Sequence, residues 1–351
     1  MTIFNNIFIV GLGLVGGSFA KTLKKYNPQQ RVGAFDTRQE YLDLALAQKD
    51  IDYSIDLSSK YDTNQSIDLI IICAPLSSYG VIFNQISGLI SDETTIIDFG
   101  SVKSFPKPKN IKNFILCHPI TGSHASGFEN CTADIFDNTQ MIICDNERDI
   151  KDNNILCLFQ SLKISPIFME VKRHDKIYAL ISHLPQFLSF LLYDITPDNL
   201  DQKNPFFKSF RLKDSDPKIW QDVFNLNEKN IENYYINFFD NLEKNVNSIA
   251  NNVKIIEKID LFYQKYQILI DDSKIDEEYL YNNFSIIMFH TLVVVSYLEI
   301  EDVASFSKFC GNGFKDFISI IKISQINKNK LSINIRDNEA KLRKMFNKIA
   351  T

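Results

Sequence analysis

The sequence predicts an α/β domain of the Rossmann type, built on a parallel sheet, followed by an all-α helical domain. A glycine-rich turn joins a short apolar run to a helical pattern near the amino terminus. Apolar runs and helical patterns then alternate as far as Met169, after which only helical periodicity follows. A length of 351 residues is typical of more than one domain. The predicted ranges are 1–168 for the Rossmann-type domain, 169–270 for a first helical copy and 271–351 for a degenerate second copy.

The composition indicates a soluble cytoplasmic protein that binds a small molecule. A formal net charge of −5 argues against a nucleic-acid partner or an anionic membrane surface. The six cysteines are scattered without a CxxC pair, so we expect neither a disulfide framework nor a metal site. The amino terminus lacks the basic region of a signal peptide, and the longest apolar segment, 284–298, is too short to span a bilayer comfortably.

The first apolar run, 7–10, is predicted to be a strand, and it leads through GLGLVGG into a helical stretch over 18–25. The GxGxxG spacing provides a tight turn, room for a pyrophosphate close to the backbone, and N–H donors at a helix amino terminus. The motif alone is a weak signal, but here it has the strand and the helix that dinucleotide binding requires. The residues predicted to hold the cofactor are Gly11, Gly13, Leu14, Val15 and Gly16.

A second predicted strand, 31–35, ends at Asp36, about 20 residues beyond the glycine motif, as in dinucleotide-binding folds. A carboxylate there accepts hydrogen bonds from a ribose and repels a 2′-phosphate, so the predicted cofactor is NAD rather than NADP. Arg38 weakens that preference because its side chain could reach such a phosphate. The alternative role for Asp36 is to cap the helix that follows.

The remaining strands of the sheet are predicted at 69–73, 94–98, 114–117, 141–144 and 164–169, with helices at 41–48 and 79–90. Right-handed crossovers make such strands parallel, so their carboxyl ends are expected to meet along one edge of the sheet. We expect Ala74, Pro75 and Ser101 at this edge to contact the cofactor, and Ser101 to lie close to His118. A serine that caps a helix is the alternative interpretation of Ser101.

His118 opens the stretch HPITGSHASGFE, which begins where a predicted buried strand ends. Pro119 is expected to prevent the strand from simply continuing. An imidazole at that edge, which titrates near neutrality, is a natural base for the proton of a hydroxyl group. On these residues alone, a capping histidine in an ordinary turn is an equally good interpretation.

Five motifs occur in a consistent order: GLGLVGGSF, DFGSVK, HPITGSHASG, HDKIYALISHLPQF and SDPKIWQDVF. Together they resemble the prephenate/arogenate dehydrogenase family over most of the chain up to Phe224. The resemblance implies the NAD-dependent oxidative decarboxylation of prephenate to 4-hydroxyphenylpyruvate in tyrosine biosynthesis. An arogenate dehydrogenase, or a cyclohexadienyl dehydrogenase that uses both substrates, is the alternative, because no residue distinguishes the keto group from the amino group.

Two other classes of protein are also alternatives. The β-hydroxyacid dehydrogenases share the layout, but they use a lysine on a helix as acid or base, and the sequence shows no such motif. A non-catalytic descendant that binds a nucleotide or an aromatic ligand would not need the full set of polar residues that the resemblance implies.

The resemblance also implies roles for single residues. His118 matches the catalytic histidine of the family, and Ser101 matches the serine that helps to hold the hydroxyl group and the histidine. His183, in the SHLP sequence, matches a substrate-binding histidine that Ser182 assists. Without the resemblance, His183 would be interpreted as an ordinary histidine in a helix.

Arg211 stands four residues before SDPKIW, where the family places the arginine that binds a substrate carboxylate. A bidentate guanidinium–carboxylate pair suits the recognition of a dicarboxylic acid. Trp220, the only tryptophan, falls at a family position near the pocket. Without the resemblance, Arg211 would be a solvated surface residue and Trp220 a core anchor.

The helical half contains an internal repeat. Residues 284–300 resemble 177–193, with His290 in the place of His183. The segment GNGFKDF, 311–317, is similar to the glycine-rich loop that precedes the carboxylate arginine in the family. The first copy has lost those glycines, whereas the second copy has lost the arginine.

These complementary losses predict a fused pseudo-dimer of helical domains. In the family, the glycine-rich loop is expected to reach the active site of the neighbouring subunit. Here Gly313 and Asp316 would complete the substrate site within one chain, and the protein would work as a monomer. Divergent helical decoration with a chance GNGF match is the alternative, with a homodimer as the expected assembly.

His124 is a departure from the family. Many relatives carry a glutamate there, expected to form a gate with the arginine and the loop aspartate. An imidazole cannot replace that carboxylate beside Arg211, although it could pair with Asp316. His124 is therefore a candidate substrate-site residue.

Overall fold

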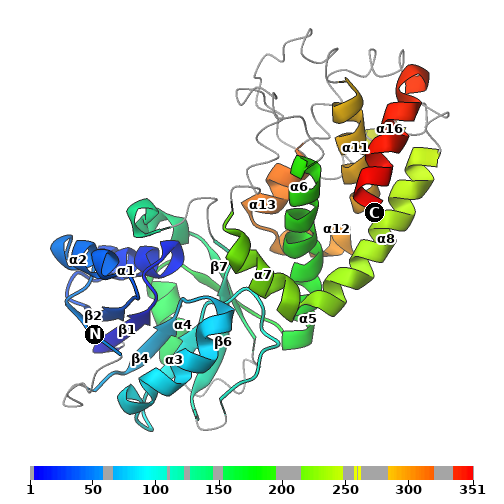
Figure 1. Cartoon of the computed structure of the whole chain (residues 1–351). Helices are drawn as coiled ribbons and strands as arrows, with labels where there is room; N and C mark the ends of the chain where they lie inside the picture. The colour runs from blue at the N-terminus through cyan, green and yellow to red at the C-terminus, as the bar shows by residue number, and fades with distance from the viewer. Residues whose placement is uncertain are drawn as a thin grey trace. The chain divides into compact units, whose positions relative to one another are not determined.

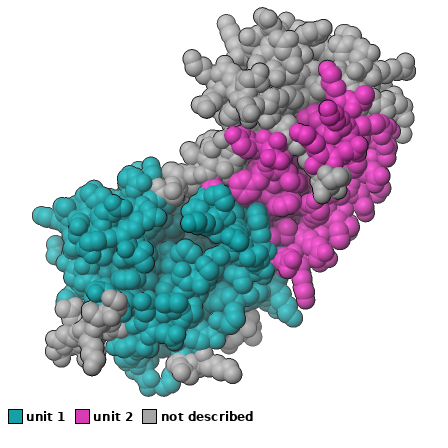
Figure 2. Space-filling model, viewed as in Figure 1, with its two compact units in different colours: residues 1–175, 216–227 teal, residues 176–215, 228–351 magenta. Residues whose placement is uncertain are grey.

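The computed structural model describes residues 4–57, 66–108, 111–121, 127–144, 153–194, 215–247, 257–258, 260–261, 284–319 and 335–350. The chain divides into two compact units, which Figure 2 shows in different colours. Unit 1 comprises residues 1–175 and 216–227, and unit 2 comprises residues 176–215 and 228–351.

Unit 1 is built on an eight-stranded sheet with the order β3-β2-β1-β4-β5-β6-β7-β8 (Figure 1). The strands are β1 (Asn6–Val10), β2 (Arg31–Phe35), β3 (Tyr53–Ser54), β4 (Leu69–Ile72), β5 (Thr95–Asp98), β6 (Phe114–Pro119), β7 (Gln140–Ile143) and β8 (Ser165–Phe168). All neighbouring pairs are parallel except β6 and β7. The prediction of a Rossmann-type sheet is confirmed. Only the two-residue strand β3 was not predicted.

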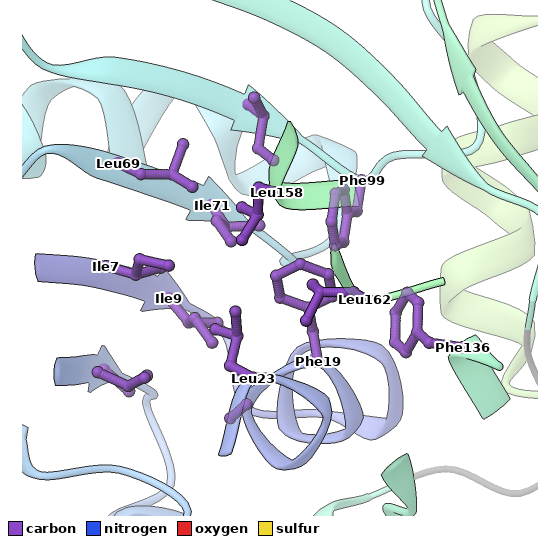
Figure 3. Close-up of a cluster of buried hydrophobic side chains, with 14 of the residues drawn as sticks. Ile7, Ile9, Phe19, Leu23, Leu69, Ile71, Phe99, Phe136, Leu158 and Leu162 are labelled. Atoms are coloured by element: carbon purple, nitrogen blue, oxygen red, sulfur yellow. The ribbon is translucent and has the colours of Figure 1, made fainter. Parts of the chain in front are cut away.

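Successive strand residues point to opposite sides of the sheet. Because the residues on both sides are apolar, helices cover both faces. Ile7 and Ile9 of β1 pack with α1 (Leu14–Tyr26), α2 (Gln39–Ala47) and α4 (Asn153–Ser161), in the cluster that Figure 3 shows. Phe8 and Val10 point the other way and pack with α3 (Tyr79–Ile86). The apolar runs read from the sequence are therefore strands that are buried on both faces.

The helix boundaries differ most from the prediction at the start of α1 and at the end of α3. α1 begins inside the glycine motif, because Gly16 and Gly17 are helical residues whose missing side chains allow close packing. A Cβ on Gly16 would lie 1.9 Å from the carbonyl oxygen of Gly11, and one on Gly17 would lie 2.5 Å from Cys131 Sγ. α3 ends at Ile86, and a 3-10 turn, Ser87–Leu89, takes the place of the last predicted turn.

β6 changes its partner in the middle of the strand. It pairs in parallel with β5 as far as Leu116 and antiparallel with β7 from Cys117 to Pro119. The strand predicted over 114–117 extends to Pro119, its last residue, and its ladder continues there only by changing from β5 to β7. The N–H groups of Cys144 and Ile120 donate to Leu116 and Gln140 at 2.7 and 2.8 Å. By alternation, Pro119 occupies a position that makes no ladder hydrogen bond, so its missing N–H costs nothing there.

Unit 2 is all-helical in the part that the structure describes, which confirms the predicted class of the second domain. Its elements are the end of α5 (Val171–Tyr178), a π-helical turn η5 (Ala179–His183), α6 (Leu184–Asp194), α8 (Glu228–Asn247), α11 (Phe284–Leu298), α12 (Val303–Phe306), a 3-10 turn η7 (Ser307–Phe309), α13 (Asn312–Ile318) and α16 (Ile335–Ala350). α7 (Pro217–Leu226) belongs to unit 1, and its first turn is capped by Asp216, which accepts a hydrogen bond from Lys218 N at 2.9 Å.

α11 is a buried helix of unit 2. It packs against α8 and α16, and its residues from Ile287 to Leu298 are almost all buried. A helix that is apolar on every side is stable in water only when neighbours cover all of its faces. Among the described helices, including α11 with its 15 residues, none is both long and apolar enough to cross a membrane.

Acidification is expected to destabilise unit 2 through His290. Burial lowers the pKa of this imidazole from 6.5 to about 3, so the folded protein keeps it neutral where the unfolded chain is protonated. Because the unfolded state then binds more protons, the free energy of unfolding falls as the pH decreases from about 6.5 towards 3. The loss between about pH 7.5 and about pH 5 is roughly 2 kcal/mol.

The variant His290→Gln should lack this contribution and gain stability relative to the wild type as the pH falls. Differential scanning calorimetry of both proteins across this range measures the effect. His174 and every other titrating group cancel in the comparison. A difference in Tm that stays constant with pH would contradict a neutral His290.

Candidate active site

The glycine turn holds β1 and α1 close together and leaves space beside Gly13. Gly11 has a φ of +98°, and a Cβ there would lie 2.6 Å from the carbonyl oxygen of Cys73. A Cβ on Gly13 would meet no atom within 4 Å. Among the described residues, no side chain caps the first turn of α1. This arrangement fits a pyrophosphate, because the helix amino terminus offers N–H donors to an open, close-approach surface.

Asp36 lies directly after β2 and faces the glycine turn. Its carboxylate accepts hydrogen bonds from Leu12 N at 2.6 Å and from Arg38 N at 2.9 Å. It does not cap α2, whose N-cap position is Arg38. The guanidinium of Arg38 bonds to the hydroxyl group of Tyr41 and lies 4.7 Å from the centre of its ring. Asp36 is thus placed for a ribose, while Arg38 is engaged with a neighbour.

The carboxyl ends of β1, β4 and β5 lie side by side, with β6 next to β5. This order brings the loops of Gly11, Ala74 and Ser101 to the edge of the sheet where His118 lies, as predicted. Ala74 and Ser101 are half-buried, and Pro75 is exposed. Residues 102–108 form no helix, so the interpretation of Ser101 as a helix cap is wrong.

A buried ion pair fixes the loop that carries Ser101. Lys103 Nζ lies 2.6 Å from Asp98 Oδ2 and donates a second hydrogen bond to the carbonyl oxygen of Cys117 at 2.6 Å. Both charged side chains are fully buried. Burial raises the pKa of Asp98, and the ammonium group of Lys103 opposes that rise. The pair joins the ends of β5 and β6, immediately before His118.

His118 is half-buried and contacts a second histidine. Its Nδ1 lies 2.8 Å from His174 Nε2, and His174 Nδ1 lies 2.8 Å from Asp175 Oδ1. His118 pairs with Ile142 across the antiparallel ladder, so β7 holds its backbone. Sequence reasoning missed Lys103, His174 and Asp175. The motifs DFGSVK and HDKIYAL contain them, but nothing local indicates which partners they meet.

A carboxylate on α7 joins this helix to the turn after β4. Asp222 Oδ2 accepts hydrogen bonds from the N–H and the hydroxyl group of Ser77, at 3.0 and 2.6 Å. This contact holds α7 beside the turn that follows Pro75. Trp220, on α7, is half-buried with its ring 5.8 Å from that of Phe224, so it is not a fully buried core residue.

The other predicted substrate residues belong to unit 2 or lie outside the described residues. His183 is buried at the end of the π-helical turn η5, beside the half-buried Ser182. π-helical turns insert one residue and often occur at functional sites. Gly313 and Asp316 lie on α13, which packs against η5 and α6. Arg211 and His124 fall outside the described residues.

The fold and these contacts define an NAD-dependent dehydrogenase with a histidine at the carboxyl edge of its sheet. The family model for the prephenate dehydrogenase nucleotide-binding domain matches residues 19–163, and the model for the prephenate dehydrogenase dimerization domain matches residues 170–261. The two matches together cover more than half of the chain. The chain belongs to the prephenate dehydrogenase family.

Named relatives agree with this membership. The cyclohexadienyl dehydrogenase of Zymomonas mobilis is 28% identical over 239 residues, which are 64% of this chain and 81% of the relative. The prephenate dehydrogenase of Lactococcus lactis is 27% identical over 263 residues, 70% of each chain. A crystal structure of prephenate dehydrogenase from A. aeolicus, in complex with hydroxyphenyl propionate and NAD+, superimposes with a TM-score of 0.63 at 25% identity, covering 71% of this chain and 92% of that one.

Removal of Lys103 is expected to be strongly destabilising. The variant Lys103→Met leaves the Asp98 carboxylate buried without its cation, which typically costs about 3–5 kcal/mol of unfolding free energy. Adding Asp98→Asn to Lys103→Met should restore part of that loss. Urea denaturation followed by circular dichroism measures the free energy of unfolding of each variant.

The matched control is Lys112→Met. Lys112 pairs with Asp92 at 2.8 Å, but both side chains are more than two-thirds exposed, so little change is expected. Equal losses of unfolding free energy in the two lysine variants would contradict a larger contribution of the buried ion pair to stability.

Proposed function

We propose that this protein catalyses the NAD-dependent oxidative decarboxylation of prephenate to 4-hydroxyphenylpyruvate, a step of tyrosine biosynthesis. The observation that carries the proposal is the position of His118. It lies at the carboxyl edge of a dinucleotide-binding sheet, in a chain that both domain models of the prephenate dehydrogenase family match. Arogenate, which carries an amino group in place of the keto group, is the second candidate substrate.

The reaction needs a base for the ring hydroxyl group. His118 takes the hydroxyl proton as the C–H bond at the same ring carbon breaks, and the ring carboxylate then leaves as carbon dioxide while the ring becomes aromatic. The proton returns to the phenolic oxygen, so no net proton is released. NAD, when bound, accepts the hydride. A positioned base of this kind contributes about 10²–10⁴-fold to the rate.

The other polar residues orient the substrate in this proposal. Ser101 holds the reacting hydroxyl group next to His118. Arg211 binds a substrate carboxylate with its bidentate guanidinium, and His183, assisted by Ser182, binds the substrate from the helical domain. Trp220 lines the pocket.

The proposed cofactor contacts all belong to unit 1. The turn of Gly11, Gly13 and Gly16, with Leu14 and Val15, receives the pyrophosphate at the amino terminus of α1. Asp36 accepts hydrogen bonds from the adenosine ribose. Ala74, Pro75 and Ser101, on the loops after β4 and β5, complete the cofactor surface.

We also propose that the second helical copy completes the site in the same chain. Contacts within unit 2 support this. The hydroxyl group of Tyr297 donates to Leu180 O at 2.7 Å, and that of Tyr178 donates to Phe309 O at 3.4 Å. The first bond ties α11 to η5, the turn that carries His183, and the second ties η7, just before α13, to the residue that precedes η5. In this proposal Gly313 and Asp316 complete the substrate site in cis, the protein works as a monomer, and His124 is a further substrate-site residue.

Substitution of the base and of the carboxylate ligand should have different kinetic effects. His118→Asn should lower kcat by about 10²–10⁴-fold while NAD binding is kept. Arg211→Ala should mainly raise KM, because a contact made equally in the ground and transition states affects binding. The formation of NADH, followed by absorbance with prephenate and with arogenate, measures both, and the ratio of kcat/KM identifies the substrate.

Near-normal turnover of His118→Asn would refute the role of His118. An unchanged KM in Arg211→Ala would count against the carboxylate contact. NAD binding by the wild type without turnover of either substrate would instead favour a non-catalytic descendant.

The assembly proposal is tested by sedimentation and by mixing inactive variants. The active protein should sediment as a monomer. His118→Asn and Asp316→Ala, co-expressed or mixed under conditions that allow subunit exchange, should not restore activity, because each chain depends on its own copy of both residues. Activity that returns in the mixture, together with a stable dimer, would show that the second copy acts across subunits.

A further inference from the structure

Three side chains of unit 1 form a continuous chain of hydrogen bonds that leads to the proposed base. Asp175 Oδ1 lies 2.8 Å from His174 Nδ1, and His174 Nε2 lies 2.8 Å from His118 Nδ1. His174 and Asp175 are on α5, and His118 is on β6. His174 is fully buried and Asp175 is 1% exposed, so neither is a surface residue that meets His118 by chance.

The outer end of this chain is a carboxylate. Asp175 accepts hydrogen bonds from Lys103 N at 2.9 Å and from Ser104 N at 2.8 Å, in addition to that of His174. Burial alone would raise the pKa of Asp175, but these donors outweigh it and hold the pKa below its ordinary value. An ionised carboxylate can only accept, so the proton between it and His174 must lie on His174 Nδ1.

The middle of the chain is a neutral imidazole. Burial lowers the pKa of His174, and the nearby Lys103 acts in the same direction against the raising effect of Asp175. A neutral His174 with its proton on Nδ1 has its lone pair on Nε2, which therefore accepts. The donor must be His118 Nδ1–H, and the lone pair of a neutral His118 then lies on Nε2.

Lys103 and Cys144 are titratable groups close to this chain of hydrogen bonds. Lys103 is paired with Asp98, so its ammonium group does not compete for Asp175. Burial raises the pKa of the Cys144 thiol to about 12, so this neighbour of Asp175 stays neutral. Asp175 supplies the negative charge on the line that ends at His118.

We propose that His174 and Asp175 are positioning residues that fix the tautomer of His118, so that Nε2 is the nitrogen that accepts the substrate proton. They also stabilise the positive charge that His118 carries after proton uptake. The same carboxylate binds the N–H groups of Lys103 and Ser104, two and three residues beyond Ser101, and so orients both segments of the catalytic edge. The kinetic part of this inference rests on the proposed function, whereas the tautomer does not.

The tautomer can be read directly in the intact protein. With five histidines in the chain, ¹⁵N-histidine NMR gives few enough signals to assign, using the spectrum of His118→Asn to identify His118. The expected pattern near neutral pH is a proton on Nδ1 of both His118 and His174. A wild-type His118 protonated on Nε2, or a His174 that is an imidazolium, would overturn the proposal whatever the turnover.

Kinetics distinguish positioning from a purely structural role. Asp175→Asn should lower kcat on the order of 10–10²-fold with KM nearly unchanged, because the loss cannot exceed that of removing the base itself. The acid limb of the kcat–pH profile should move to lower pH, since the cation of His118 loses its support. His174→Gln, whose amide oxygen can still accept from His118, should retain more kcat than His174→Phe.

A double-mutant cycle gives the decisive comparison. In the His118→Asn background, His174→Gln should have no further effect on kcat, because a residue that acts through His118 has nothing left to position. Thermal unfolding of each variant confirms that the compared proteins are folded. Losses that simply add in the double variant would overturn the proposal, as would an acid limb that does not move. Absence of turnover in the wild type would refute the proposed function and leave the NMR result to decide the tautomer.

Discussion

Lys103 carries its ammonium group into the interior of unit 1, where it meets Asp98 and the carbonyl oxygen of Cys117. Removing two charges from water is costly, and a buried pair is tolerated when further hydrogen bonds satisfy the remaining polar atoms. Asp98 meets this requirement because it also accepts from Tyr79 and from Gly100 N. The backbone N–H of Lys103 binds Asp175 as well. One lysine thus ties β5, β6 and α5 together at the edge that holds the proposed base.

The change from parallel to antiparallel pairing along β6 also helps to position His118. A fully parallel strand would be held by its neighbours only as far as its carboxyl end, and His118 would lie on a loop. The antiparallel pairing with β7 extends the ladder over His118 and Pro119, so the backbone of His118 is held like that of a strand residue. Pro119 fits because it occupies a non-hydrogen-bonded position of this antiparallel ladder. Side-chain contacts to α5 can then set the direction of the imidazole without also having to order its backbone.

Local features of the sequence predicted most of unit 1 and its nucleotide site. The apolar runs gave the strands, and the glycine spacing gave the turn at Gly11, because both depend on neighbours in the chain. β3 was missed because two residues carry no periodicity, and the β6–β7 reversal was missed because strand direction depends on tertiary pairing. The partners of His118 were missed for a similar reason. His174 is 56 residues away from it, and Asp175 is 72 residues from Lys103.

In the helical half, the apolar helix α11 has to be kept out of water. α11 is apolar on every face, and each large side chain that it buries contributes roughly 1.5–3 kcal/mol relative to exposure. Other helices must cover such a helix. A partner subunit can do so only at protein concentrations at which the dimer forms. In this chain α8 and α16 supply that cover in cis. In the proposed pseudo-dimer the helical half would cover its own apolar helix without a partner, and selection would then not keep both glycine loops and both arginines. Under the proposed duplication, the absence of the glycines from one copy and of the arginine from the other is the outcome expected once a single chain holds both copies.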